Sequence, residues 1–424
     1  MTIRIPFNKP SIVGSELIYV GQAVAGGHAS GDGPFTKRAE AMLEEHFDAN
    51  RVLLTTSGTS ALELAAFLCD LRPGNEVIVP SYTFVSTANA FVLRGARPVF
   101  VDIRPDTLNI DERLIEQAIT PRTRAIFPVH YGGVGCEMDA IMDIANRHGL
   151  FVVEDAAHSL CARYKDRWLG TIGHLGCYSF HETKNVSCGE GGALVVNDPA
   201  LESRAEILRE KGTNRSQFMR GEIDKYSWVD VGSSYVLSDM LAAFLVGQIE
   251  NMDKITRRRG EIFDLYSAML APLVERGLIR IPVVPQHCAT SYHMFYILTG
   301  DTEERTALIA HLRASGILAV FHYVPLHSSP FAQSLGTPQT NLPMTDELST
   351  RLLRLPMYFD LADWAVEEVA SAVLDFYQPG AIAQSAGNAN TNYLRRKASR
   401  IARKGAASGG IGAAAQPVDA SGAS

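Results

Sequence analysis

The chain has 424 residues, 46% of them hydrophobic and 20% charged, so it can bury a large core and is long enough for two domains. Its formal net charge of −7 argues against a nucleic-acid-binding protein, which would present a basic face. The six cysteines are widely spaced and form no C-x-x-C pair, so we expect neither a disulfide framework nor a metal site. No signal peptide is evident and no apolar run reaches 18 residues, so we expect a cytoplasmic protein that does not span a membrane.

The first part of the chain has the pattern of an α/β domain. Residues 1–35 are predicted to be irregular, and from residue 36 onward short apolar strands alternate with helical segments. This alternation is typical of a largely parallel sheet, whose ligands gather beyond the carboxyl ends of the strands. We expect strands at residues 52–55, 76–80, 98–103, 125–130 and 150–155, and helices at residues 36–47, 57–71, 83–95, 112–119 and 138–149.

The second part predicts a smaller α+β domain that follows a long helix at residues 255–270. A helix at residues 201–212, a polar loop at residues 213–228 and a helical end to residues 233–255 precede it. Within the smaller domain we expect strands at residues 294–300 and 318–325, and helices at residues 302–315, 345–354 and 361–377. The predicted boundaries are 1–254 for the large domain with its N-terminal segment, 255–378 for the small domain, and 379–424 for a disordered tail whose composition cannot form a core.

One lysine, Lys184, stands between two predicted strands in the stretch CYSFHETKNVSCGEGG, residues 177–192. The flanking strands are predicted at residues 177–180 and 192–196. A lone loop lysine is more often solvated than catalytic, so its significance depends on the partners that the rest of the chain supplies.

A candidate anion site lies at residues 57–59, where a predicted strand meets the start of a helix. Backbone N–H groups of Gly58 and Thr59, together with the positive end of the helix, favour an anion there. Ser179 could add a hydroxyl to the same phosphate. The alternative is a helix N-cap without a ligand.

Three further side chains suit a planar, nitrogen-containing ring. Asp155 closes the apolar strand VVED, and a buried acid needs a cationic partner such as a protonated pyridine nitrogen. Phe84 could stack on the ring and His158 could hydrogen-bond a ring hydroxyl, although a helix cap, a core phenylalanine and a core histidine are the simpler alternatives. With the phosphate cradle and Lys184, these residues meet the requirements of pyridoxal 5'-phosphate. Lys184 would form the Schiff base and act as general base, its pKa lowered by desolvation and nearby cationic charge.

The sequence resembles the pyridoxal-phosphate-dependent sugar aminotransferases of the DegT/DnrJ/EryC1/StrS family over residues 5–377. The matching stretches, in order, are SGDGPFT, TSGTSALELAA, VIVPSYTFVSTANA, PVFVDI, VHYGG, VVEDAAH, SFHETKN, GEGGALVVND and HYVPLH. The resemblance implies pyridoxal-phosphate fold type I, of the aspartate aminotransferase kind, and a homodimer with active sites at the interface. It also implies the following roles: Lys184 as the Schiff-base lysine, Asp155 at the pyridine nitrogen, Gly58, Thr59 and Ser179 at the phosphate, Phe84 on the ring, and His158 near the 3-hydroxyl.

Residues 211–239 are most similar to one subgroup, the dTDP-4-amino-4,6-dideoxygalactose transaminases of cell-surface polysaccharide biosynthesis. That similarity implies amination of dTDP-4-keto-6-deoxyglucose at C4 with L-glutamate as the donor. The resemblance places the loop at residues 213–228 near the active site, and we expect Arg215, Tyr226 and also His322 to contact the nucleotide-sugar. One departure is Val236, where many family members have an asparagine for the partner subunit's phosphate; Ser238 or a backbone N–H could replace it.

Other functions stay open at this point. The substrate could be a C3-keto or UDP-linked sugar, or the chain could be a non-catalytic protein with the same fold. Related sugar 3-dehydratases carry histidine in place of the lysine, and Lys184 argues against that activity.

Overall fold

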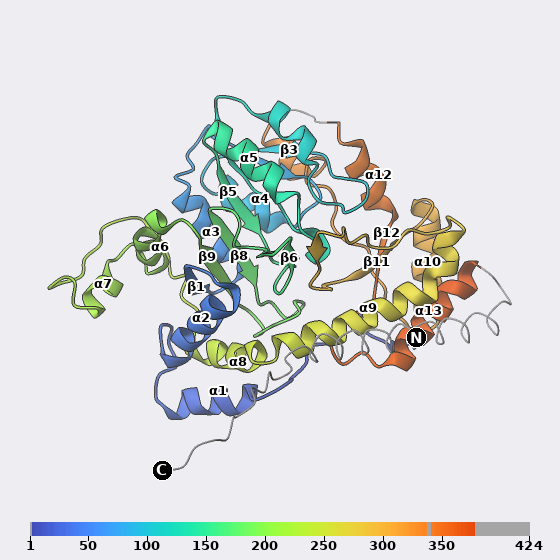
Figure 1. Cartoon of the computed structure of the whole chain (residues 1–424), viewed down its shortest axis with the longest axis horizontal. Helices are drawn as coiled ribbons and strands as arrows, with labels where there is room; N and C mark the ends of the chain where they lie inside the picture. Colours follow the sequence, from blue (N-terminus) through green and yellow to red (C-terminus); the bar gives the residue numbers. More distant parts are fainter. Residues whose placement is uncertain (1, 337–340, 378–424) are drawn as a thin grey trace, which may run out of the picture.

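The computed structural model describes residues 2–336 and 341–377, and its first half is built on a seven-stranded mixed sheet. In spatial order the strands are β1 (Arg51–Thr55), β9 (Gly192–Val196), β8 (Leu175–Ser179), β5 (Phe151–Asp155), β4 (Thr123–Ile126), β2 (Glu76–Pro80) and β3 (Arg97–Val101) (Figure 1). From β8 to β3 all neighbours are parallel, whereas β9 is antiparallel to both β8 and β1. The mostly parallel mixed sheet expected from the sequence is therefore confirmed. The predicted tail at residues 379–424 lies outside the described residues.

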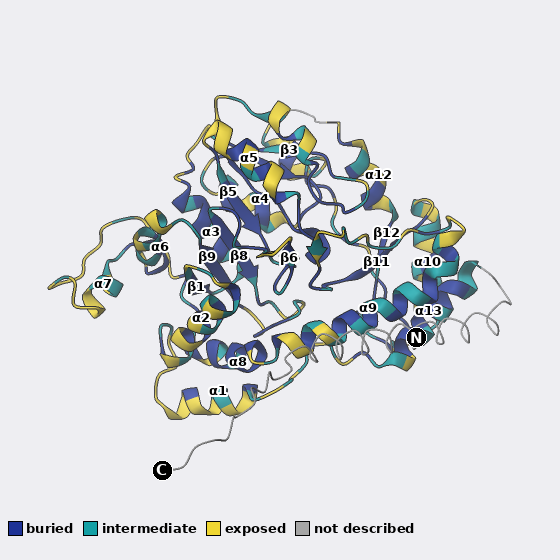
Figure 2. Cartoon of the chain, viewed as in Figure 1, coloured by how far each residue is buried: buried dark blue, intermediate teal, exposed yellow. Residues whose placement is uncertain are grey.

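Helices cover both faces of this sheet, which is why its strands read as continuous apolar runs. They are α2 (Pro34–Phe47), α3 (Gly58–Leu68), α4 (Val85–Val92), α5 (Met138–His148), α6 (Glu202–Arg209) and α8 (Asp239–Ile249). In β9, Leu194 and Val196 pack toward α3, while Ala193 and Val195 pack toward α2 and α8. Figure 2 shows the strands as the buried centre of this part of the molecule.

A second core lies around the long helix α9 (Met252–Glu275). It is formed with α10 (Thr302–Ala314), α13 (Asp363–Tyr377) and the antiparallel pair β11 (Phe295–Leu298) and β12 (Leu352–Leu355). Because α9 begins before residue 255 and continues well beyond it, the domain boundary there stays a prediction.

The N-terminal segment packs on this second core. Ile5 belongs to it and forms a parallel bridge with Ile317. The backbone N–H of Met357 donates to the carbonyl oxygen of Phe7 at 3.2 Å. The segment thus joins the beginning of the described chain to its last third.

Several sequence expectations are wrong in detail. Residues 1–35 contain α1 (Glu16–Ala25), which packs on α8; the buried Glu16 accepts hydrogen bonds from the N–H groups of Val13 and Gly14. The helix expected at residues 112–119 is two 3-10 turns, η1 (Glu112–Leu114) and η2 (Glu116–Ala118). The loop at residues 213–228 contains a short helix, α7 (Arg215–Met219).

The strand expected at residues 318–325 is absent from the described structure. Only Val320 pairs there, through a single bridge to Arg354. The strand that pairs with β11 is β12, which follows directly on α12 (Pro343–Arg351). The sequence pattern had assigned most of β12 to the helix expected at residues 345–354.

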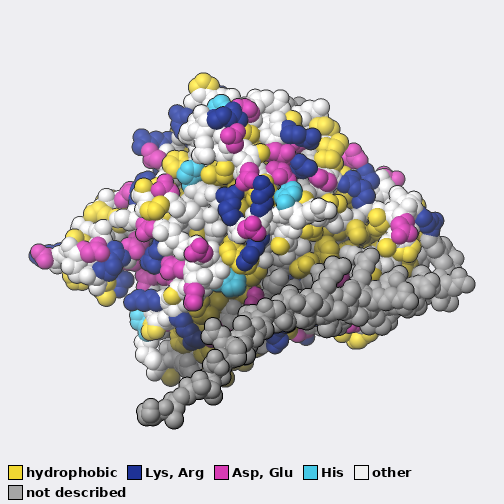
Figure 3. Space-filling view, in the orientation of Figure 1, with side chains coloured by type: hydrophobic (Ala, Val, Ile, Leu, Met, Phe, Trp, Pro, Cys, Tyr) yellow, Lys and Arg dark blue, Asp and Glu magenta, His cyan; other side chains and the backbone are white. Residues whose placement is uncertain are grey.

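Two surface properties bear on function. Within the described residues no helix is long and apolar enough to cross a bilayer. On the face shown in Figure 3, acidic and basic side chains are interspersed among the described residues, and charges of one sign do not form a continuous field.

Candidate active site

A cavity of about 680 Å³ opens at the carboxyl ends of β1, β2, β4, β5 and β8 and is closed on its other side by residues of the second core. It brings together residues that are far apart in the sequence. Among the residues that line it are Gly58, Thr59, Phe84, Asp155, His158, Ser179, Lys184 and His322.

Lys184 lies in the loop between β8 and β9, and the pairing of these strands closes the base of the loop. Ser179 pairs with Gly192, and the N–H of Lys184 donates to the carbonyl of His181 at 2.9 Å. The side chain is half-buried. Burial, opposed by the Asp155 carboxylate and reinforced by the Arg354 charge, lowers the pKa of Lys184 to about 8. About a tenth of the amine is therefore neutral at pH 7, far more than for an exposed lysine.

The first turn of α3 forms a cradle with unsatisfied donors. The Ser57 side chain caps the helix by accepting from the N–H of Ser60 at 3.0 Å. The N–H groups of Gly58 and Thr59 have no acceptor within the part of the chain that the structure describes. Ser179 packs directly against Gly58, and a Cβ atom on that glycine would lie 3.2 Å from the Ser179 Oγ. Two N–H groups and a hydroxyl are thus available for one anion.

Asp155 is buried at the end of β5, and both of its carboxylate oxygens are held in place. Oδ2 accepts from the Thr87 hydroxyl at 2.7 Å, and Oδ1 accepts from the N–H of Ala157 at 3.1 Å. The carboxylate has no ion-pair partner among the described residues. It can therefore accept a further hydrogen bond from a cationic ligand group in the cavity.

His158 is part of a stack of rings on the cavity wall. Its ring lies 4.2 Å from that of His293, nearly parallel, and its Nδ1 accepts from the N–H of Gly132 at 3.4 Å. That contact assigns the proton to Nε2, which donates to the Tyr323 hydroxyl at 3.1 Å. Burial, reinforced by the charges of Lys184 and Arg354, lowers the pKa of His158 well below its usual value, so the ring is neutral at pH 7.

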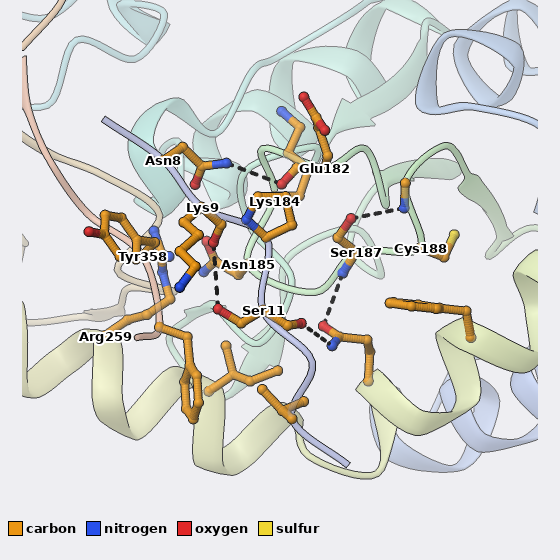
Figure 4. Close-up of a pocket in the computed structure, with 17 residues that line it drawn as sticks. Asn8, Lys9, Ser11, Glu182, Lys184, Asn185, Ser187, Cys188, Arg259 and Tyr358 are labelled. Atoms are coloured by element: carbon orange, nitrogen blue, oxygen red, sulfur yellow. Dashed lines mark hydrogen bonds between the residues drawn. The ribbon is translucent and has the colours of Figure 1, made fainter. Parts of the chain in front are cut away.

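A second, smaller cavity of about 190 Å³ lies on the other side of the lysine loop (Figure 4). Lys184 borders both cavities, and residues 8–11 and 13 of the N-terminal segment line the smaller one. The Asn8 side chain donates to the carbonyl of Glu182 at 3.3 Å, which ties this segment to the lysine loop. Within the described residues, no group of three or more His, Cys, Asp or Glu side chains is arranged to hold a metal ion.

The sequence profile of the DegT/DnrJ/EryC1/StrS aminotransferase family matches residues 10–374. The chain belongs to this family. It is a pyridoxal-phosphate-dependent sugar aminotransferase with the type I fold, as expected from the sequence.

Named relatives cover almost the whole described chain. The aminotransferase is 35% identical over 380 residues to the spore coat polysaccharide biosynthesis protein SpsC of Bacillus subtilis (strain 168), covering 88% of this chain and 96% of that protein. The crystal structure of the aminotransferase TlmJ from Streptoalloteichus hindustanus is 31% identical, with a TM-score of 0.81, and covers 88% of this chain and 98% of TlmJ. The PLP form of a putative sugar aminotransferase, Spr1654 from Streptococcus pneumoniae, is 27% identical with a TM-score of 0.80 and covers 88% and 99%.

The residues of the cavity fit the family's cofactor. The cradle at Gly58 and Ser179 suits a phosphate, the buried Asp155 suits a ring N–H⁺, and the Lys184 amine lies in the same cavity. When bound, pyridoxal phosphate supplies an aldehyde that condenses with amines and a ring that accepts electrons from the adjoining carbon. The individual role of each residue remains a proposal.

Phe84 lines the cavity but is 54% exposed, and its ring centroid lies 6.0 Å from that of Tyr323. A phenylalanine of the hydrophobic core would be buried, so this exposure argues against the alternative that Phe84 is only a core residue. The ring is available to a ligand that enters the cavity.

Two of the expected substrate residues lie away from this cavity. Arg215 begins α7, with its Nη1 3.5 Å from Glu210 Oε2, and Tyr226 is 52% exposed with its ring near Phe218. Neither lines the cavity of its own chain, and α7 projects from the body in Figure 1. Their contact with substrate therefore stays a prediction that requires a second subunit.

Val236, which stands where many family members have an asparagine, makes an apolar contact. Val236 packs against Gly31, and a Cβ atom on that glycine would overlap the valine side chain. Ser238, the suggested replacement, caps α8 by accepting from the N–H of Leu241 at 3.4 Å. What contacts a partner's phosphate at this position stays open.

Among the residues that line the cavity and that sequence reasoning missed are His293, Tyr323 and Arg354. Each comes from the last third of the chain, and none stands in a motif with a local chemical signature. Tyr323 directly follows His322 in HYVPLH, so the matched stretch was the one signal that could have found it.

Proposed function

We propose that this aminotransferase moves an amino group from L-glutamate to C4 of a nucleotide-linked 4-keto-6-deoxy sugar. The specific reaction is dTDP-4-keto-6-deoxy-D-glucose to dTDP-4-amino-4,6-dideoxy-D-galactose, for a cell-surface polysaccharide. The observation that carries the proposal is the Lys184 amine, with its lowered pKa, in the same cavity as Asp155 and the Gly58 cradle. The sugar is supported by the similarity of residues 211–239 to that subgroup, and the pathway by the 35% identity to SpsC, a spore coat polysaccharide biosynthesis protein.

In this proposal the sheet's carboxyl edge binds the cofactor. The N–H groups of Gly58 and Thr59 and the hydroxyl of Ser179 donate to its phosphate. Asp155 accepts a hydrogen bond from the ring N–H⁺, and Thr87 keeps the carboxylate oriented.

Lys184 is the residue that moves protons. Its neutral amine would take the proton from the substrate carbon that carries the nitrogen and release it at the cofactor's C4′ position, and it would carry the proton in the opposite direction for the second substrate. His158 is neutral, lines the cavity and would lie near the ring hydroxyl, and Phe84 would stack on the ring.

The acceptor sugar is placed by the opposite wall and by a second subunit. Nδ1 of His322 lies 2.7 Å from the Tyr131 hydroxyl, a contact that orients the ring and leaves its Nε2 to form a hydrogen bond with a sugar hydroxyl. Arg215 and Tyr226 of a homodimer partner would contact the diphosphate and nucleotide. The cytoplasm, where nucleotide-sugars are made, is the expected location.

The direct test is NMR of the product formed from L-glutamate and dTDP-4-keto-6-deoxyglucose. An amino group at C4 with the galacto configuration is expected; a product aminated at C3, or no turnover of this sugar, would replace the assigned substrate. Lys184→Ala should keep the folded oligomer and lose transamination. Substantial turnover by a well-folded Lys184→Ala protein would remove Lys184 from the proposed role.

A further inference from the structure

Asn185 directly follows Lys184 (Figure 4) and ties the lysine loop to the segment that precedes β11. Its side-chain Nδ2 donates to the carbonyl of Ser291 at 2.7 Å, and its Oδ1 lies 3.0 Å from Nδ1 of His293. Because a carbonyl oxygen can only accept a hydrogen bond, the contact with Ser291 fixes the orientation of the Asn185 amide. Oδ1 therefore faces His293, and Nδ1 of His293 donates to it.

This contact sets the tautomer of a buried histidine. His293 lines the active-site cavity, and with its proton on Nδ1 its Nε2 carries the lone pair. The residues that the structure describes make no hydrogen bond to this Nε2. The ring stacks on that of His158, with centroids 4.2 Å apart, and His158 has its proton on the opposite nitrogen. His293 is thus held by stacking and by Asn185, and one acceptor atom remains free.

The groups whose charges act on His293 are basic, and no carboxylate is among them. Burial lowers the pKa of His293 well below its usual value, and four neighbours lower it further: His158, Lys184, Arg259 and Arg354. The His293 ring is therefore neutral at pH 7. The two arginines stay protonated and His158 stays neutral, so Lys184 is the neighbour that gains and loses a proton near neutral pH.

We propose that Asn185 is a positioning residue that keeps Nε2 of His293 as a hydrogen-bond acceptor for the Lys184 ammonium group. This inference rests on the proposed function, in which the Lys184 amine takes a proton from the substrate. A buried ammonium ion needs acceptors. The Asp155 carboxylate already accepts two hydrogen bonds from the protein and would accept a third from the cofactor ring.

A neutral imidazole suits this task better than an acid. The proton stays on Lys184, and His293 only accepts a hydrogen bond from it. A neutral acceptor stabilises the ammonium ion less than a carboxylate does, so the lysine can still release the proton in the next step. With the opposite tautomer, His293 would present an N–H group to the ammonium ion and repel it. Asn185 prevents this, because its Oδ1 is the acceptor that Nδ1 has within the described chain.

The tautomer can be measured in the purified holoenzyme by ¹⁵N NMR with labelled histidine. The signal of His293 is identified by its absence from His293→Phe. We expect the wild type to carry the proton on Nδ1 and to have an unprotonated Nε2, and we expect Asn185→Ala to lose this preference. Asn146→Ala, which removes an exposed asparagine of α5, is the matched control and should give the wild-type spectrum.

Single-turnover rates test the consequence for Lys184. In the donor half-reaction, L-glutamate alone changes the absorbance of the bound cofactor; in the acceptor half-reaction, the aminated enzyme reacts with the keto-sugar. His293→Phe keeps a ring that can stack on His158 but has no nitrogen. The maximal rates of both half-reactions should fall about ten- to a hundred-fold, as expected for the loss of a hydrogen bond to a charged group. The substrate concentrations for half-maximal rate should change little, because His293 acts on the lysine.

Two further readouts separate positioning from general damage to the fold. L-glutamate deuterated at its α-carbon should give a larger isotope effect in His293→Phe and in Asn185→Ala than in the wild type, because proton transfer by Lys184 has become slower. The double variant should be no slower than His293→Phe alone, because Asn185 acts through the histidine.

Four outcomes would overturn the inference. A proton on Nε2 of His293 in the wild type, or a spectrum that Asn185→Ala leaves unchanged, would show that Asn185 does not set the tautomer. Wild-type rates in folded His293→Phe would show that Lys184 needs no such acceptor. A double variant slowed by the full effect of both changes would show that Asn185 acts on the lysine loop itself. The NMR result needs no substrate, so it stands even if the enzyme reacts with no amino acid, which would refute the proposed function.

Discussion

Gly58 and Ser179 approach each other so closely that a Cβ atom on Gly58 would lie 2.8 Å from the Ser179 Cβ. Glycine is therefore required where the first turn of α3 meets the end of β8, and this contact places two backbone N–H groups beside a hydroxyl. The anion cradle depends on the absence of a side chain at residue 58 as much as on the groups that donate hydrogen bonds.

Gly58→Ala should weaken cofactor binding, because the first turn of α3 or Ser179 must move to admit the methyl group. Overpacking of this kind costs about 1–3 kcal/mol, so we expect the dissociation constant for pyridoxal phosphate to rise about tenfold or more. Equilibrium dialysis of the apoenzyme measures it. Gly21→Ala in α1, where an added Cβ meets no atom within 4 Å, is the control and should bind the cofactor normally. Unchanged affinity in Gly58→Ala would show that the phosphate is held elsewhere.

The pKa of Lys184 sets the pH at which the apoenzyme takes up its cofactor. A neutral amine is the reactive form, and burial lowers the pKa from 10.5 to about 8, so the uptake rate should rise with pH through about 8. Removing the opposing carboxylate in Asp155→Asn should move this midpoint to lower pH, and removing the positive charge in Arg354→Gln should move it to higher pH. Stopped-flow absorbance across a pH series measures the midpoints. Shifts of the same sign in both variants would contradict the electrostatic account.

Asp155→Asn should slow the chemical step. The carboxylate's hydrogen bond to a charged ring nitrogen contributes about 1.5–3 kcal/mol, which corresponds to a loss of about ten- to a hundred-fold in rate. Single-turnover measurements in both half-reactions locate the loss, and it should appear in each, since both use the same ring. A variant with wild-type single-turnover rates would reduce Asp155 to a structural residue that orders the end of β5 through Thr87 and Ala157.

Arg215→Ala should raise KM for the dTDP-sugar and spare the glutamate half-reaction, because glutamate has no diphosphate. Since Arg215 lies outside the cavity of its own chain, the effect should cross between subunits. After subunit exchange in an equimolar mixture of Arg215→Ala and Lys184→Ala, about half of the dimers would be mixed and would have one complete site of two, so about a quarter of all sites would have the wild-type KM for the sugar. A mixture in which no site recovers the wild-type KM would place Arg215 on its own chain or in solvent.

The sequence predicted the sheet-borne half of the site well, because each residue there follows a strand with a clear apolar pattern. Lys184 lies between two strands whose ends were recognisable from Cys177 and Gly192, and Asp155 closes an uninterrupted apolar run. In parallel sheets such strand ends converge at one edge, so local patterns were enough to bring these residues together.

The opposite wall could not be predicted in the same way. The run at residues 318–325 reads as a strand, yet it lines the cavity and pairs only at Val320. Arg354 appeared to belong to a helix, because the short strand β12 follows α12 without a break. Its charge acts on Lys184, which is far from it in the sequence, and this proximity is a property of the folded molecule that leaves no mark on neighbouring residues. Helix α1 was missed for a related reason: glycines flank it in the sequence, and its position depends on packing against α8.

The docking of the N-terminal segment has a consequence for the order in which the enzyme is completed during synthesis. Ile5 forms a β-bridge with Ile317, and the carbonyl of Phe7 accepts a hydrogen bond from the N–H of Met357. Contacts of such sequence separation form late, because the long intervening chain must first be closed into a loop. The cradle at Gly58 and the lysine loop are translated well before those partners leave the ribosome. The nascent chain can thus fold the region of the cofactor site before residues 5–7 have bound to their partners. The wall that carries Phe7 and Arg354 is then completed last.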